Sequence, residues 1–260
     1  MPSRRQFLAG TVAAVFVAAC SDSGGRGGSE AAPGTTTMSP TTTTLPPTTT
    51  TVPTGPAAFA TGGPTDTNRV ALTFHTSGNL DLAGQLLDVL GAREVVMTAF
   101  IVGEWLDANP TWASRIVDAG HELANHTYTH PTFGTLSPEA MADEIGRCRE
   151  VLVRLGGTAG QYFRPSGTAD GTTAPSPGVL AAAGTAGYRT VLGFNVDPLD
   201  YQDPGAAAVT ERVLAAAGPG SVVSLHFDHP GTIEALPAIL DGLAQRGLQP
   251  GTAAQLLAPA

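Results

Sequence analysis

The sequence predicts an α/β domain built on a parallel sheet or barrel. Two observations lead to this prediction: short β-like runs alternate with segments of helical spacing, and this alternation occupies the stretch after residue 63. The chain has 260 residues, of which 42% are hydrophobic, so it is long enough to bury one sizeable core. We therefore expect a single folded domain over residues 64–260.

The first residues are typical of an export signal. Arg4 and Arg5 form a twin-arginine pair, and the apolar run over 9–19 is too short for a permanent membrane span. Cys20 follows Val-Ala-Ala, as in a bacterial lipobox. We expect residues 1–19 to be a signal peptide and Cys20 to be acylated, which would anchor the exported protein to the outer face of the cytoplasmic membrane.

The segment that follows Cys20 has the composition of a linker. Residues 21–63 are rich in Gly and Ser and then in Thr and Pro, with very few apolar side chains to bury. Such a segment cannot offset the entropy lost on ordering. We therefore expect residues 20–63 to form a lipidated, disordered tether.

Within the folded part, β-like runs punctuate helical patterns. The expected strands are Arg69 to Phe74, Val95 to Ile101, His121 to Asn125, Gln161 to Arg164, Tyr188 to Phe194 and Ser221 to His226. Ser137 and Pro138 supply an N-cap and a first-turn proline for a helix. The apolar stripe of that helix comprises Met141, Ile145, Cys148, Leu152 and Leu155.

Charge excludes one class of partner. The formal net charge is -9, and no cluster of basic side chains is present that would neutralise phosphates. We therefore expect no nucleic-acid binding.

Histidines are concentrated where strands are expected to end. His126 and His130 are four residues apart, so a helical turn between them would direct both imidazoles to one side, as in many zinc sites. His121 falls inside an expected strand and is interpreted as a satisfied core residue. Cys148 is interpreted as a buried core thiol without a disulfide partner.

Four ordered motifs resemble the polysaccharide deacetylases of the NodB-homology type, carbohydrate esterase family four. The motifs are GHELANHTYTHP at 120–131, FRPSG at 163–167, NVDPLDY at 195–201 and SLH at 224–226. The resemblance implies a distorted (β/α) barrel. It also implies metal-assisted removal of acetyl groups from a glycan such as peptidoglycan, capsule or another acetylated polysaccharide.

The resemblance also implies roles for individual residues. His126 and His130 would bind a divalent metal, zinc or else cobalt or nickel, and Arg164 would support the base. His226, paired with Asp200, would be the general acid. The groove residues implied in this way are Ser166 and Gly167 near the oxyanion, Tyr201 in place of a tryptophan, and Ser224 in place of a leucine.

The chain departs from the family at one motif. The family has T-F-D-D-G where this sequence has Thr-Phe-His75-Thr76-Ser, so the base and the third metal ligand are both missing as acids. Three interpretations remain open. His75 completes a three-histidine metal site, or His75 acts as the base, or the barrel no longer hydrolyses and binds cell-wall carbohydrate. We favour the two hydrolytic interpretations because His126, His130 and His226 are all retained.

Overall fold

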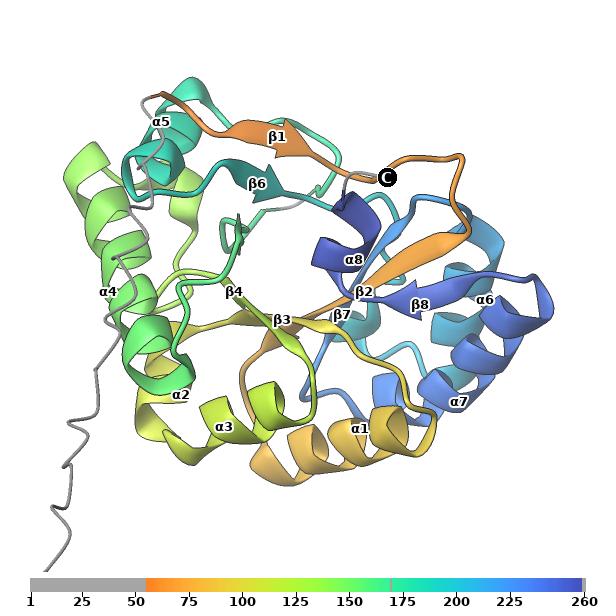
Figure 1. Cartoon of the computed structure of the whole chain (residues 1–260). Coiled ribbons are helices and arrows are strands. Elements are labelled where there is room, and N and C mark those ends of the chain that lie inside the picture. Colours follow the sequence, from red (N-terminus) through yellow and green to blue (C-terminus); the bar gives the residue numbers. More distant parts are fainter. Residues whose placement is uncertain (1–54, 169, 259–260) are drawn as a thin grey trace, which may run out of the picture. The chain divides into compact units, whose positions relative to one another are not determined.

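The structure is a computed structural model that describes residues 55–168 and 170–258. The signal peptide, Cys20 and most of the expected linker lie outside the described residues. The described part is a curled parallel sheet with helices packed around it (Figure 1). This arrangement agrees with the predicted α/β barrel class.

All the expected strands are present, and two short strands were missed. The strands are β1 (Ala58–Ala60), β2 (Arg69–Thr76), β3 (Thr98–Ile101), β4 (Glu122–Asn125), β5 (Tyr162–Phe163), β6 (Thr190–Leu192), β7 (Val222–His226) and β8 (Gln249–Gly251). Their order in the sheet is β1-β6-β5-β4-β3-β2-β7, with β8 also paired to β2. Every pairing between these strands is parallel.

The folded domain begins earlier than predicted. β1 lies in the stretch assigned to the linker and pairs with β6. Ala57 is buried, and its N–H donates to the carbonyl oxygen of Leu180. The boundary at residue 64 was therefore wrong, because three residues of small and aromatic side chains give too little periodicity to be recognised as a strand.

Helices surround the sheet and place the loops that follow the strands. They are α1 (Leu80–Ala92), α2 (Gly103–Ala108), α3 (Thr111–Asp118), α4 (Pro138–Gly156), α5 (Pro177–Thr185), α6 (Ala206–Ala216), α7 (Pro230–Gln245) and α8 (Ala253–Leu257), with 3-10 turns η1 (Phe133–Thr135) and η2 (Asp200–Gln202). As predicted, Ser137 caps α4 by accepting a hydrogen bond from the N–H of Ala140. Cys148 is a buried free thiol on this helix.

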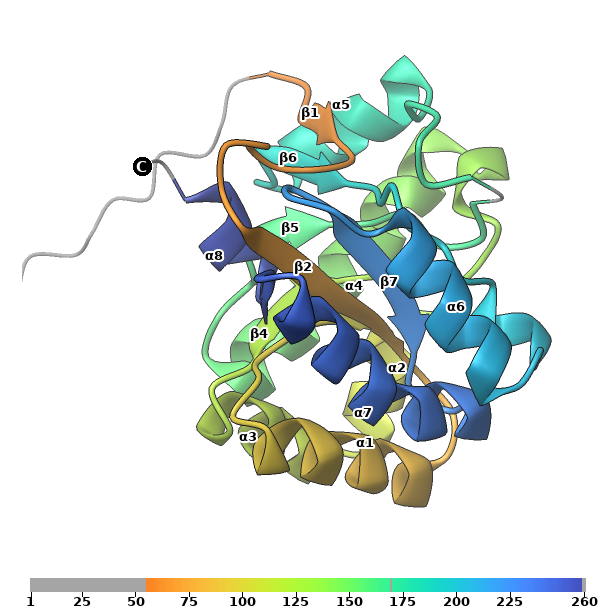
Figure 2. The ribbon, with the colours of Figure 1, turned by 90° about the vertical axis from the view of Figure 1, so that its right-hand side faces the viewer.

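Strand β2 separates two environments by its alternation of side chains. Val70, Leu72 and Phe74 belong to the main hydrophobic core between the sheet and its helices. The intervening side chains point to the other face, because successive residues of a strand alternate. Figure 2 shows β2 and β7 side by side, with α6 and α7 packed along them. His75 therefore projects into the interior of the barrel.

The two edges of the curled sheet meet through short bridges. Gly62, just after β1, forms an antiparallel bridge with Ser221, and Val196 forms a parallel bridge with Val223. Beneath the site, a cluster that includes Phe100, Phe194 and Leu256 fills the interior. Within the described residues, no helix combines the length and apolar character that crossing a membrane requires.

Candidate active site

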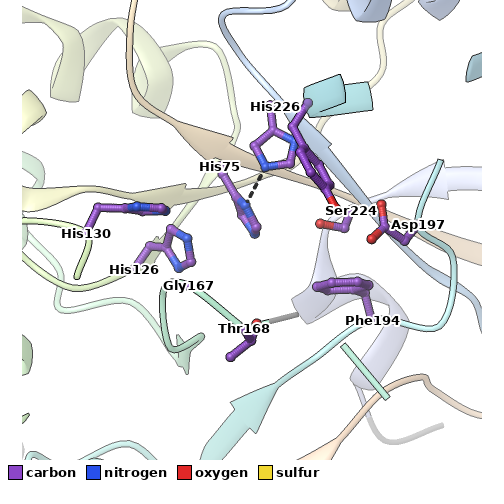
Figure 3. A pocket seen from close by; sticks show the side chains of 10 residues that line it. His75, His126, His130, Gly167, Thr168, Phe194, Asp197, Ser224 and His226 are labelled. Carbon is purple, nitrogen blue, oxygen red and sulfur yellow. Dashed lines mark hydrogen bonds between the residues drawn. The ribbon is translucent and has the colours of Figure 1, made fainter. Parts of the chain in front are cut away.

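A pocket of about 160 Å³ contains most of the residues expected to act (Figure 3). It is lined by His75, His126, His130, Gly167, Thr168, Phe194, Asp197, Tyr201, Ser224 and His226. His75 and His226 lie near the carboxyl ends of their strands, and His126 directly follows β4. Because the strands are parallel, these ends meet at one edge of the barrel, where α/β barrels assemble their sites.

The register of β2 and β7 brings two imidazoles together. His75 is the pairing partner of His226 across these strands. Their side chains share a face, and Nδ1 of His75 lies 3.0 Å from Nε2 of His226, a contact drawn as a dashed line in Figure 3. Burial lowers the pKa of His75 well below its usual range, with further lowering by the charges of neighbouring histidines and Arg164.

A buried carboxylate orients His226. Nδ1 of His226 donates to Oδ1 of Asp200 over 2.8 Å. The other carboxylate oxygen accepts from the backbone N–H of His226 at 2.8 Å and from the hydroxyl of Thr232 at 2.7 Å. Asp200 is 1% exposed, so it does not reach a ligand and serves to fix the His226 ring.

Arg164 lies behind the pocket wall and is 1% exposed. Nη1 donates to Nε2 of His75 and to the hydroxyl of Thr73, both over 3.0 Å. Nε and Nη2 donate to the carbonyl oxygens of Leu192 and Gly193. Burial lowers the pKa of Arg164 to about 9, and the charge of Asp197 opposes this lowering. Arg164 therefore contacts His75, the residue that replaces the family's base.

The loop after β4 carries the histidine pair in a conformation that differs from the predicted helical turn. Thr127 and His130 have positive φ values of 69° and 60°, so the segment 126–130 is not helical. The rings of His126 and His130 are nevertheless adjacent, with centroids 5.0 Å apart. The backbone N–H groups of Tyr128 and Thr129 donate to the buried carboxylate of Glu144 on α4, which holds this loop.

One ring nitrogen of His126 lacks a hydrogen-bond partner among the described residues. Its Nδ1 donates to the carbonyl oxygen of Arg164 over 2.9 Å, so Nε2 carries the lone pair. This Nε2 is buried and has no hydrogen-bond partner within residues 55–168 and 170–258. A histidine that binds a metal through one ring nitrogen usually donates its other ring N–H to an acceptor such as a backbone carbonyl oxygen. Burial lowers the pKa of His126 well below its usual range, which keeps the ring neutral.

These residues fit a metal ion only in part. His126 and His130 together offer two nitrogen donors, whereas catalytic zinc sites usually have three protein ligands. Both nitrogens of His75 are hydrogen-bonded, and its ring stacks on His126 with centroids 4.2 Å apart and an interplanar angle of 25°. Over the described ranges, no group of three or more His, Cys, Asp or Glu side chains is arranged to hold a metal. His75 therefore does not supply a third ligand in this arrangement.

Three of the four predicted groove residues line the pocket, and Ser166 does not. Tyr201 and Ser224 line the pocket, and Tyr201 is 46% exposed. Gly167 also lines it and has a φ of 63°, where a Cβ would lie 2.8 Å from the Cα of Thr132. Ser166 is fully buried, and its hydroxyl donates to the carbonyl oxygen of Pro131, so it supports the loop and does not face the pocket.

Sequence reasoning missed three lining residues and misjudged one histidine. Phe194 and Thr168 both line the pocket. Phe194 directly precedes the motif NVDPLDY and Thr168 directly follows FRPSG, so adjacency to these motifs could have identified them. Asp197 also lines the pocket, and its carboxylate caps a turn by accepting from the N–H of Leu199. His121 is buried as predicted, but its Nε2 has no partner within the described part of the chain, so it is not a fully satisfied core residue.

Comparison with known proteins identifies the family. The family model described as polysaccharide deacetylase matches residues 62–191. The chain belongs to this family. A chitooligosaccharide deacetylase of Rhizobium leguminosarum bv. trifolii is 34% identical over 198 residues, which cover 70% of this chain and 89% of the relative. A peptidoglycan-N-acetylglucosamine deacetylase of Bacillus cereus is 30% identical over 197 residues, with coverage of 73% and 68%.

Solved structures of polysaccharide deacetylases share the fold. The Bc1960 peptidoglycan N-acetylglucosamine deacetylase is 29% identical, with a TM-score of 0.71 and coverage of 78% of this chain and 94% of that one. BA3943 of Bacillus anthracis, described as a CE4 family pseudoenzyme, is 26% identical, with a TM-score of 0.71 and coverage of 76% and 68%. A mutant of BA3943 is described as having restored enzymatic activity. The prediction of a deacetylase-like hydrolase with a distorted barrel is thus confirmed.

Proposed function

We propose that this protein removes acetyl groups from an acetylated glycan of the cell envelope, as an N-acetyl amide or an acetyl ester. The observation that carries the proposal is that one pocket contains both His126 and His226. Nε2 of His126 is buried and has no hydrogen-bond partner in the described part of the chain, and a buried carboxylate orients His226. Nε2 of His126 can bind a cation, and the ring of His226 can transfer a proton. Support also comes from the relatives that are named for peptidoglycan and chitooligosaccharide deacetylation.

A divalent metal, zinc or else cobalt or nickel, is part of this proposal. His126 and His130 would hold it, and when bound it would polarise the acetyl carbonyl and acidify water. Because two imidazoles bind more weakly than the usual three protein ligands, we expect the metal to be acquired from the medium and lost readily on chelation.

The chain's own residues supply the rest of the chemistry. His226 moves a proton at Nε2, and Asp200 holds its ring in place through Nδ1. The exposed ring of Tyr201 provides an apolar surface beside the pocket against which a sugar can pack. Ser224 gives the pocket a hydroxyl where family members have leucine, so the acyl group meets a more polar wall.

The proposed location is the cell envelope. The twin-arginine pair, the lipobox-like sequence that ends at Cys20 and the Thr/Pro-rich segment support an exported protein anchored by lipid to the outer face of the cytoplasmic membrane. The tether would let the domain reach wall or capsule polymer.

Acetate release from N-acetylated chitooligosaccharide and from peptidoglycan fragments tests the proposal. The mature chain with added zinc should release acetate, and His126→Ala and Asp200→Asn should each lower the rate by roughly 100-fold or more. Asp203→Asn is the matched control, since Asp203 lies three residues from Asp200 and bonds only His229 among the described contacts of its side chain. A wild-type chain that releases no acetate with zinc, cobalt or nickel would refute the proposal.

A second candidate is a glycan-binding protein that has lost hydrolysis. The observation that favours it is the loss of both motif acids, together with a His75 whose two nitrogens are already bonded. This candidate predicts no metal after purification, no acetate release, and glycan binding that Tyr201→Ala weakens and His126→Ala leaves unchanged. Titration of the same oligosaccharides by calorimetry distinguishes the two candidates.

A further inference from the structure

Four side chains form a continuous hydrogen-bonded chain through the pocket. Arg164 Nη1 lies 3.0 Å from His75 Nε2, His75 Nδ1 lies 3.0 Å from His226 Nε2, and His226 Nδ1 lies 2.8 Å from Asp200 Oδ1. One end of this chain is a buried cationic side chain and the other is a buried carboxylate. Two imidazoles lie between them.

The donor and acceptor roles along this chain are fixed by its ends. A guanidinium has only donors, so Nε2 of His75 must accept and the proton of a neutral His75 must be on Nδ1. That Nδ1–H then donates to Nε2 of His226, which must accept in turn. The remaining proton of His226 is therefore on Nδ1, where the carboxylate of Asp200 accepts it. The opposite tautomer of His75 would place an N–H against the guanidinium.

The surroundings of His75 support this assignment. The side chain lies among other imidazoles, stacked on His126 and edge-on to His226 at a centroid distance of 4.6 Å. Because Nη1 of Arg164 donates to Nε2 of His75, that nitrogen carries no proton, so the ring has a single N–H, at Nδ1. The hydroxyl of Thr73 holds the second hydrogen of Arg164 Nη1, so the guanidinium cannot turn away from His75 without losing that bond.

We propose that His75 is a positioning residue that, together with Asp200, keeps His226 in the tautomer with Nδ1 protonated and Nε2 able to accept. This inference rests on the proposed function. His226 is then the group that first receives the proton of the attacking water, a role that the missing base would have filled. His75 does not replace the acids as ligand or base. It holds the tautomer of His226 from the Nε2 side, as Asp200 holds it from the Nδ1 side.

His226 alone carries the proton between the attacking water and the leaving nitrogen. Water displaces the N–H of His75 from Nε2 of His226. Its oxygen forms a bond to the acetyl carbon while the π pair of the carbonyl moves onto the carbonyl oxygen, and one water proton passes to Nε2. The carbonyl then re-forms as the carbon–nitrogen bond breaks, the electron pair of that bond stays on nitrogen, and the proton returns from Nε2 to that nitrogen. The products are a free amine and acetic acid, which releases its remaining proton to water as acetate.

Long-range ¹H–¹⁵N spectra of the full mature chain labelled in histidine test the tautomer directly. We expect His226 and His75 to be protonated at Nδ1 only, with His75 assigned by its loss in His75→Gln. Glutamine can accept from Arg164 and donate to His226, so His226 should keep its tautomer in this variant. His75→Leu has similar bulk and no polar atoms, so it removes one of the two bonds that hold this tautomer, and His226 should shift part of the way toward the tautomer with Nε2 protonated. A wild-type His226 protonated at Nε2 would overturn the proposal.

Acetate release separates this inference from the proposed function. His75→Gln should retain activity within about tenfold and His75→Leu should lose roughly 100-fold, in the range expected for a proton acceptor. Equal rates in both variants would overturn the role of His75. If wild type releases no acetate while the spectra show the expected tautomers, the proposed function and the proton transfer fail and the positioning role stands.

Discussion

At the residue scale, the motif that departs from the family determines the character of the whole site. The sequence identified His75 as the departure but could not say what its ring does. The contacts of the His75 ring depend on the register of β2 with β7, which places His75 opposite His226, and on Arg164, which is 89 positions away in the chain. Contacts between residues so far apart in sequence leave no local pattern.

Restoring both acids is expected to convert the site into a metal centre. Thr76 is fully buried, and its hydroxyl donates to the carbonyl oxygen of Phe100 over 3.3 Å. The double variant His75→Asp, Thr76→Asp would have a buried carboxylate at position 76 without a partner. This lowers the free energy of unfolding by about 3–5 kcal/mol unless a cation binds. We expect the double variant to be less stable than wild type in chelator, to recover with zinc, and to release acetate roughly 100-fold faster than wild type.

Thermal unfolding with and without zinc measures this response. The control is His75→Asp with Thr76→Asn, which has the same shape at position 76 and no charge there. Zinc should stabilise the double-acid variant well above this control. A zinc response of equal size in the two variants would show that position 76 does not face the metal.

At the scale of elements, helix α4 holds the histidine loop in place. Glu144 is 8% exposed and accepts from the N–H groups of Tyr128 and Thr129, each over 2.8 Å, and from the hydroxyl of Thr129 over 2.7 Å. These bonds fix the backbone between His126 and His130 although it is not helical. The sequence predicted the helix and its buried stripe, yet it gave no reason to expect an acid on that stripe.

Removing the Glu144 carboxylate should therefore loosen the loop. Glu144→Ala removes the acceptor of the part-buried bonds from the N–H groups of Tyr128 and Thr129, and we expect the free energy of unfolding to fall by about 1–3 kcal/mol. Glu150→Ala, on the exposed side of the same helix, should change it by less than about 0.5 kcal/mol. Denaturant unfolding measures both variants. Equal losses would mean that the helix itself, and not its bonds to the loop, is the sensitive feature.

Helix α8 is joined to the base of the barrel by a second acid, Glu122 on β4. Oε2 of Glu122 accepts from the hydroxyl of Thr98 over 2.7 Å and from the N–H of Ala254 over 3.1 Å. Burial raises the pKa of Glu122 despite these bonds, and Oε1 has no partner among the described residues. The stability that protonated Glu122 contributes is therefore complete below the pKa of Glu122 in the unfolded chain, and it is lost as the pH rises through the pKa of Glu122 in the folded protein.

Glu122→Gln should accordingly change stability in a pH-dependent way. The amide stays neutral, so the variant is expected to gain stability relative to wild type as the pH rises from 4 to 8, a window set by roughly 4.3 for a free glutamate and the raised folded value. Denaturant unfolding of both proteins across this range measures the difference. A difference that is constant with pH, or that favours wild type more strongly at pH 8, would contradict the assignment.

At the scale of the whole molecule, the sequence predicted most of the architecture and few of the contacts. Periodic runs such as 69–74 and 221–226 located the strands that carry the site, because a buried strand repeats its pattern over several residues. β8 contains proline and glycine in a three-residue strand, so it has no comparable pattern. The pocket itself arises from the curling of the parallel sheet, which brings strand ends together from both halves of the chain.

The expected anchor concerns the whole protein, and the chain's two cysteines allow a matched test. Cys148 is fully buried, its thiol donates to the carbonyl oxygen of Ile101, and burial raises its pKa to about 12, so it is inert. If Cys20 is acylated, Cys20→Ala should move the exported protein from the membrane pellet to the soluble fraction, whereas Cys148→Ala should leave it in the pellet. Fractionation with and without detergent measures this. Retention of both variants in the pellet would mean that the apolar run over 9–19, and not a lipid on Cys20, attaches the protein to the membrane.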